Sequence, residues 1–134
     1  MKKIGIINAP ISTVISHLGH SDTIAVVDAG FPIPKATQRI DLALKRGTPG
    51  FIETLEVILE EMYVEKAYIA NEIMTYSPNV YEQITKLLPG IPFEMIPHVD
   101  IKKYSEFSHA VIRTGEFTPY SNIILVSGAW GFKL

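Results

Sequence analysis

Short apolar runs alternate along this chain with segments of helical periodicity, and no other feature constrains its fold as strongly. Residues 24–27 and 67–70 are continuous apolar runs, typical of strands that are buried on both faces of a sheet. Three more strand-like segments cover 93–96, 110–114 and 122–127. Alternation of this kind predicts a largely parallel sheet with helices on both faces.

The predicted helices lie in segments where apolar residues recur at intervals of three and four. These residues are Ile11, Val14, Ile15 and Leu18 in the first segment, Phe51, Leu55, Ile58, Leu59 and Met62 in the second, and Val80, Ile84, Leu87 and Leu88 in the third. Pro10, Pro49 and Pro78 lie where these helices would begin. The sequence therefore predicts an α/β fold, a three-layer αβα single domain spanning 1–134. The last two strands are candidates to pair with each other, which predicts an antiparallel C-terminal element in a mostly parallel sheet.

Composition excludes several classes of protein. A chain of 134 residues with 47% hydrophobic residues is long enough to bury one core. Twelve basic and fourteen acidic residues leave no basic surplus for binding nucleic acid. No apolar run approaches the roughly 18 residues of a membrane span, and no signal peptide is recognisable. Cysteine is absent, so disulfides and zinc–thiolate sites are excluded, and we expect a cytoplasmic protein.

Polar residues follow the predicted strands at the points where the strands end. They are Asp28, Asn71, Glu72, His98, Arg113 and Thr114. In open α/β sheets, ligands bind outside the carboxyl ends of the strands, where such groups converge. The pattern predicts one site that is built from distant segments, although each residue taken alone is equally typical of a surface loop.

The segment from 110 to 122 carries more polar chemistry than a turn requires. Gly115 and Pro119 satisfy the backbone needs of the turn. Arg113, Tyr120 and Asn122 add a set of hydrogen-bonding groups that is able to hold hydroxyl groups.

His20 is the candidate for proton transfer. It follows Gly19, at the expected end of the first helix, and an unperturbed imidazole titrates near neutrality. His17, His20 and Asp28 also suggest a metal site, but their spacing matches no specific metal-binding motif. Glycine-rich nucleotide-binding motifs are absent, so a nucleotide cofactor has no support.

Two blocks, 18–34 and 111–122, resemble the ribose pyranase and fucose mutarotase family, and within it the ribose pyranase branch. Weaker matching stretches are 1–8, 46–51 and 60–66. The resemblance implies an isomerase that interconverts the pyranose and furanose forms of β-D-ribose without any cofactor or metal. It also implies a symmetric homo-oligomer, a decamer, with its turn near 120–122 at a subunit boundary.

The resemblance further assigns roles to individual residues. His20 matches the acid catalyst of the family. The sugar-binding positions are matched by Asp28, His98, Tyr120, Ser121 and Asn122. Ser121 stands where the family has alanine, which leaves the sugar preference open.

These side chains are able to catalyse the implied reaction, because opening and closing a sugar ring needs only proton transfers. General acid–base catalysis of this kind contributes about 10²–10⁴ in rate. Three alternatives stay open at this point. They are a non-enzymatic sugar-binding or transport-accessory module, a fucose-type mutarotase, and a metal-dependent hydrolase that uses His17, His20 and Asp28.

Overall fold

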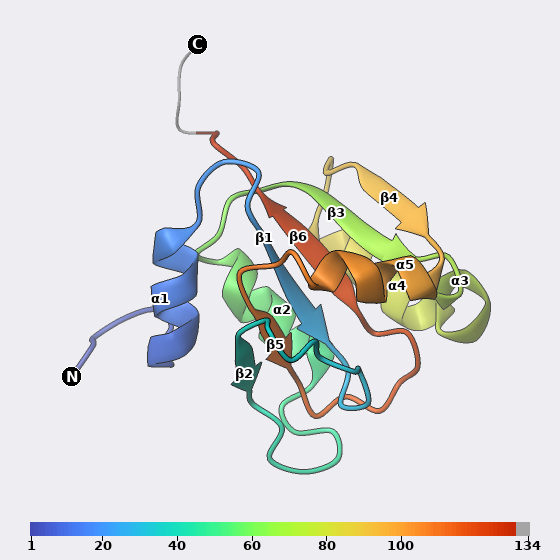
Figure 1. Ribbon diagram of the computed structural model, residues 1–134, viewed down its shortest axis with the longest axis horizontal. Helices are drawn as coiled ribbons and strands as arrows, with labels where there is room; N and C mark the ends of the chain where they lie inside the picture. Colours follow the sequence, from blue (N-terminus) through green and yellow to red (C-terminus); the bar gives the residue numbers. More distant parts are fainter. Residues whose placement is uncertain (131–134) are drawn as a thin grey trace.

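A six-stranded mixed sheet forms the centre of the computed structural model, which describes residues 1–130 (Figure 1). The α/β class and the layered arrangement predicted from the sequence are confirmed. In chain order the elements are α1 (Ala9–His17), β1 (Thr23–Val27), β2 (Arg39–Asp41), α2 (Phe51–Leu59), β3 (Val64–Ala70), α3 (Ile73–Tyr76), α4 (Pro78–Leu87), β4 (Phe93–Ile96), α5 (His98–Ser105), β5 (Val111–Arg113) and β6 (Ile123–Ser127).

The strand order is β2-β5-β1-β6-β3-β4, and every strand is parallel to the others except β6. The predicted antiparallel C-terminal element is therefore present, but the expected pairing of the last two strands is wrong. β5 pairs with one edge of β1, and β6 pairs antiparallel with the other edge of β1 and with β3. A direct hairpin is favoured by a loop of two to five residues, whereas the longer segment 114–122 carries the chain past the end of β1.

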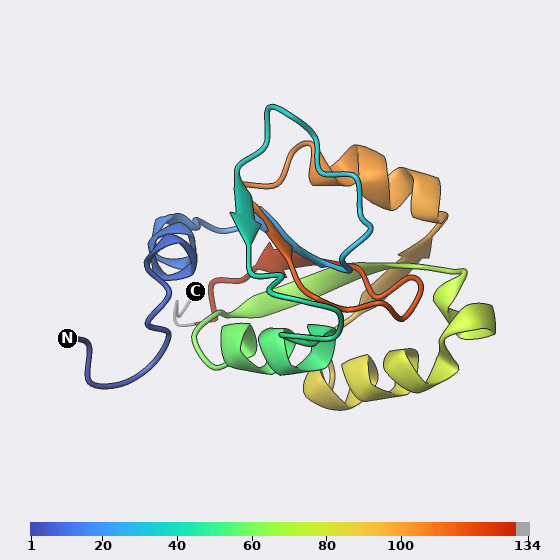
Figure 2. The same cartoon turned by 90° about the horizontal axis from the view of Figure 1, so that it is seen from below.

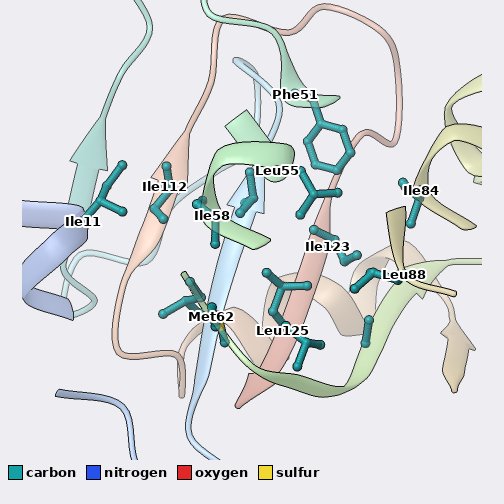
Figure 3. Packing of buried hydrophobic residues seen from close by; sticks show 14 of the residues in the cluster. Ile11, Phe51, Leu55, Ile58, Met62, Ile84, Leu88, Ile112, Ile123 and Leu125 are labelled. Atoms are coloured by element: carbon teal, nitrogen blue, oxygen red, sulfur yellow. The ribbon is translucent and has the colours of Figure 1, made fainter. Parts of the chain in front are cut away.

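The two faces of the sheet carry separate apolar clusters, because neighbouring residues of a strand point to opposite faces. Ile24 and Val26 of β1 face the larger cluster, where α1, α2 and α4 pack, whereas Ala25 and Val27 face the smaller one (Figures 2 and 3). Ile101 of α5 covers the smaller cluster. The helices thus form the two outer layers of the three-layer fold.

The predicted helices are present, but each ends before its last predicted apolar residue. α1 ends at His17, before Leu18, and α4 ends at Leu87, before Leu88. α2 ends at Leu59, so Met62 lies in the following turn, although its side chain is still buried. Ser77 precedes α4 as expected, but its hydroxyl donates to the Pro119 carbonyl instead of capping the helix.

Three short elements were not predicted. β2 has three residues, and α3 has four. α5 buries only Ile101 and Ser105, so its sequence shows no clear apolar stripe. Elements this short or this polar lack the periodicity by which helices and strands are recognised.

The topology brings the ends of all strands to two opposite edges of the sheet. The parallel strands β1 to β5 end at one edge, which we call the carboxyl-end edge, and β6 begins there. The opposite edge, where β1 begins, is the amino-end edge. Within residues 1–130, no helix combines the length and the apolar character that a membrane crossing requires.

Candidate functional site

Asp28 and Asn122 form a reciprocal pair at the carboxyl-end edge. Asp28 is the first residue after β1, and Asn122 directly precedes β6, which runs antiparallel beside it. The Asp28 backbone N–H donates to Asn122 Oδ1 at 2.9 Å, and Asn122 Nδ2 donates to Asp28 Oδ2 at 3.1 Å. Asn122 is fully buried. The amide therefore fixes both the backbone and the carboxylate of Asp28.

The second Asp28 oxygen, Oδ1, accepts from the Gly30 N–H at 3.0 Å. Burial raises the pKa of the Asp28 carboxyl, against the lowering effect of the hydrogen bonds from Asn122 and Gly30 and of nearby His98. A carboxyl group with a raised pKa holds and releases protons more readily near neutrality than an exposed one.

His98 is the first residue of α5 and lies near Asp28. Its ring packs edge-on against Phe31 (centroids 6.1 Å apart) and against Tyr120 (5.1 Å apart). Its Nδ1 is buried and has no hydrogen-bond partner among residues 1–130. Burial lowers the pKa of the imidazole and Lys102 lowers it further, while Asp28 and Glu72 act in the opposite direction. A neutral imidazole at this position is able to accept a proton.

Tyr120 extends an aromatic surface beside His98. Its ring lies 5.4 Å from the ring of Tyr76 in α3, and the Tyr76 side chain is exposed. The Tyr120 backbone has a φ of +61°, a left-handed conformation that a non-glycine residue adopts only when its surroundings hold it there. Aromatic rings of this kind give sugars an apolar face to pack on, and the tyrosine hydroxyls add polar contacts.

Ser121 is fully buried, and its hydroxyl has no hydrogen-bond partner within the described part of the chain. Asn122 is buried as well, but its amide is bonded to Asp28. Of the three consecutive residues 120–122, Tyr120 is therefore the one whose side chain is partly exposed.

A cavity of about 250 Å³ adjoins Asp28. It is lined by Asp28, Ala29, Gly30, Arg113, Glu116 and Phe117. A cavity of this size is sufficient for a monosaccharide. Asp28 is thus accessible from this cavity and also lies near His98.

Three polar residues near Asp28 mainly stabilise its loops, and two of them, Arg113 and Thr114, were predicted for the site. The Arg113 guanidinium bonds the Ala29 carbonyl at 2.9 Å and the Asp41 carboxylate at 3.1 Å. Glu116 accepts from the Phe51 N–H at the start of α2. The Thr114 hydroxyl is buried and donates to the Val27 carbonyl. These bonds hold the loops that carry Asp28 and Tyr120.

His20 lies at the opposite, amino-end edge. It precedes β1, whereas Asp28 follows it, so the whole length of the strand separates the two residues. Its Nε2 is 2.8 Å from Glu65 Oε2, and its side chain is 59% exposed. Within one chain, His20 therefore does not reach Asp28. The role of His20 as acid catalyst stays a prediction.

The alternative metal site made of His17, His20 and Asp28 does not form either, because Asp28 lies at the other edge. Residues 1–130 contain no group of three or more histidine, aspartate or glutamate side chains placed to hold a metal ion. His109 pairs with Asp22 at the amino-end edge, away from the cluster, as its position before β5 predicts.

The sequence-predicted residues Asp28, His98, Tyr120 and Asn122 do converge at one edge. Phe31 and Tyr76, which complete the aromatic surroundings, were missed. Phe31 carried a signal, because a large apolar residue between Gly30 and Pro32 is unusual in an exposed loop. Tyr76 carried none, since it belongs to the four-residue helix α3.

Comparison with known proteins gives consistent matches over nearly the whole chain. A sequence model described as the RbsD / FucU transport protein family matches residues 1–130. A protein of Laribacter hongkongensis named D-ribose pyranase is 52% identical over 128 residues, covering 96% of this chain and 98% of the relative. A D-ribose pyranase of Lactobacillus gasseri matches with the same identity and coverage.

Solved structures agree with these matches. Bacillus subtilis RbsD, solved in complex with D-ribose, superposes with a TM-score of 0.93 at 42% identity, covering 96% of this chain and 98% of the other. The fucose mutarotase of Streptococcus pneumoniae, solved with L-fucose, has a TM-score of 0.79 at 21% identity, covering 92% and 94%. At that identity the second likeness shows the fold alone.

Proposed function

The chain belongs to the RbsD / FucU transport protein family, and from this premise we propose that it catalyses the D-ribose pyranase reaction, the interconversion of β-D-ribopyranose and β-D-ribofuranose. The observation that carries the proposal is the hydrogen-bonded Asp28–Asn122 pair beside a half-buried His98. The chain that holds this cluster is about half identical, over nearly its full length, to proteins named D-ribose pyranase.

The reaction requires an acid and a base at the same time. When the pyranose ring opens, the anomeric O1–H loses its proton, the C1–O5 bond breaks and O5 gains a proton, which leaves an aldehyde at C1. When the furanose ring closes, O4 attacks C1, O4–H loses its proton and O1 gains one. No electrons leave the sugar, and the proton count is unchanged.

The side chains divide this work in our proposal. His98 takes up the anomeric proton on its imidazole, and His20 delivers a proton to the ring oxygen. Asp28 and Tyr120 bind and orient hydroxyl groups, and Asp28 relays protons with His98. Asn122 holds Asp28 in place, and Ser121 contributes backbone at the same turn.

His20 requires a second copy of the chain. A five-residue strand spans roughly 16 Å, so His20 of the same chain is out of reach of a sugar at Asp28. We therefore propose a homo-oligomer, a decamer, in which His20 of one subunit approaches the Asp28 cluster of a neighbour. Exposed apolar side chains, including Ile4, Ile7 and Phe117, favour such an assembly. The proposal includes a cytoplasmic location, which the absence of cysteine favours.

Magnetisation-transfer NMR on ribose tests the function. Catalytic amounts of protein should accelerate exchange between the β-pyranose and β-furanose signals and leave their equilibrium ratio unchanged. Unchanged exchange rates with detectable ribose binding would instead support a non-enzymatic sugar-binding or transport-accessory module. L-fucose, measured in the same way, serves as the comparison substrate, and faster exchange on it than on ribose would support a mutarotase.

A further inference from the structure

Glu72 links the ends of two neighbouring strands at the candidate site. It follows β3, and His98 follows β4, the parallel neighbour of β3. The Asn71 N–H bonds the Ile96 carbonyl at 2.9 Å, which ties the two strand ends together. The Glu72 side chain then reaches the start of α5, where its Oε2 accepts from the His98 N–H at 2.8 Å.

α5 depends on this carboxylate for its first N–H group. The residue before the helix is Pro97, which offers no side-chain cap. The first N–H groups of a helix have no partner within the helix, and a negative charge beside them is stabilising. A hydrogen bond from an N–H to a carboxylate is also shorter and stronger than a neutral one. Glu72 therefore caps the helix from a different element of the fold.

This bond holds His98, the residue of α5 that lies near Asp28. The His98 ring is confined by the edges of Phe31 and Tyr120, and its backbone is held by Glu72. The position of His98 is thus fixed through both its ring and its backbone. Its Nδ1 is buried and has no hydrogen-bond partner among residues 1–130.

We propose that Glu72 is a positioning residue for the ring interconversion, which holds the His98 imidazole at the sugar and whose charge supports the proton that His98 takes up. The inference rests on the proposed function, because that function assigns His98 as the proton acceptor. Glu72 itself does not touch the sugar.

The charges around His98 determine what removal of the Glu72 charge should do. Asp28 faces His98 from the end of β1, Glu72 from the end of β3, Lys102 from within α5, and Tyr120 from the loop before β6. Asp28 and Glu72 raise the pKa of His98, whereas burial and Lys102 lower it. Without the Glu72 charge the pKa of His98 falls further, so His98 stays neutral to a lower pH.

The experiment compares Glu72→Gln, Glu72→Ala and wild-type protein by the pH profile of ring exchange and by NMR titration of the His98 ring proton. Glu72→Gln keeps an acceptor but loses the charge. The acidic limb of its pH–rate profile and the titration of its His98 ring should both move to lower pH by about 0.5–1 unit. The ring-exchange rate at the plateau of the profile should fall about two- to fivefold. Glu72→Ala should show the same shift and lose about 10–100-fold in turnover, because the imidazole is no longer held.

Glu82→Gln is the matched control. Glu82 lies in α4 and pairs with Lys86 on the surface, so this variant should retain the wild-type pH profile and rate. A Glu72→Gln variant whose His98 titration coincides with that of wild type overturns the inference. If wild-type protein does not accelerate ring exchange but the His98 titration shifts in Glu72→Gln, the proposed function fails and the link between Glu72 and His98 stands.

Discussion

At the carboxyl-end edge of the sheet, His98 is half-buried between two aromatic rings, whereas at the amino-end edge the His20 side chain is 59% exposed. His98 is also held through its backbone by Glu72. His20 contacts Glu65 at 2.8 Å on the surface. The two histidines of the proposed mechanism therefore lie in opposite environments.

In the proposed mechanism, a small domain divides a reaction between its two edges. The carboxyl-end edge is organised within one chain, because the antiparallel strand β6 brings Asn122 to Asp28. In that mechanism, the histidine at the amino-end edge acts on a sugar that is bound by a neighbouring chain. Binding of sugar should therefore depend on the fold of one subunit, and turnover should depend on assembly.

The largest expected effect separates turnover from binding at the amino-end edge. His20→Gln removes the proposed proton donor and should lower kcat by about 10²–10⁴, with ribose affinity little changed. His17→Gln is the control, since His17 lies at the end of α1 and has no role in the proposal. Ring-exchange rates and ribose titrations measure both parameters. Equal losses at His17 and His20, restored by added metal, would contradict the role of His20 as acid catalyst.

Mixing two inactive variants tests whether the edges of different subunits meet. His20→Gln and His98→Gln proteins should each be nearly inactive. Subunits refolded together in equal amounts should regain about one quarter of the wild-type rate, because a quarter of the shared sites then contain both histidines. Light scattering on the same samples reports the assembly. No recovery of activity in a mixed oligomer would contradict a site that combines His20 and His98 of different subunits.

The difference in burial should appear in stability. Asn122→Ala leaves the Asp28 N–H and carboxylate without their partner and should lower the free energy of unfolding by about 2–4 kcal/mol. His20→Ala removes an exposed surface pair and should cost less than about 1 kcal/mol. Urea unfolding at one fixed protein concentration compares the two. Equal costs would contradict the contrast between the edges.

The smallest expected effect is the pH dependence of stability at the carboxyl-end edge. The pKa of His98 is lowered in the folded protein, chiefly by burial, so folding favours the neutral imidazole. This contribution is fully present above the unfolded-state pKa of about 6.5 and is lost as the pH falls through the folded-state value. Urea unfolding between pH 7 and pH 5 should therefore show a smaller loss of stability for His98→Gln than for wild type. A parallel decline of both proteins would contradict this assignment.

The sequence predicted the parts of this molecule that have strong local patterns. The buried run at 24–27 and the helix that begins at Phe51 are confirmed, and the polar residues after the strands converge as the topology of parallel sheets predicts. The pairing of β5 with β6 was predicted wrongly, because nearness in sequence does not reveal which edge of β1 each strand occupies.

Sequence patterns did not predict the position of His20. A histidine after a helix and before a strand was expected near the mouth of the site, but the loop leads to the amino end of β1. The resemblance assigned His20 a role without placing it. Burial of Ser121 and the bond from His98 to Glu72 arise from contacts between distant segments, for which local spacing carries no signal.

The position of β6 also determines how the chain is able to fold. This strand is the last in sequence, yet it lies between β1 and β3 in the interior of the sheet. Until residues 123–127 leave the ribosome, β1 and β3 have no common neighbour, and the sheet exists only as two unconnected halves. Contacts between such distant segments slow folding, because a long loop must close before they form. Synthesis of the chain through β6 must therefore precede closure of the sheet, and the pairing of Asp28 with Asn122 should be among the last events of folding.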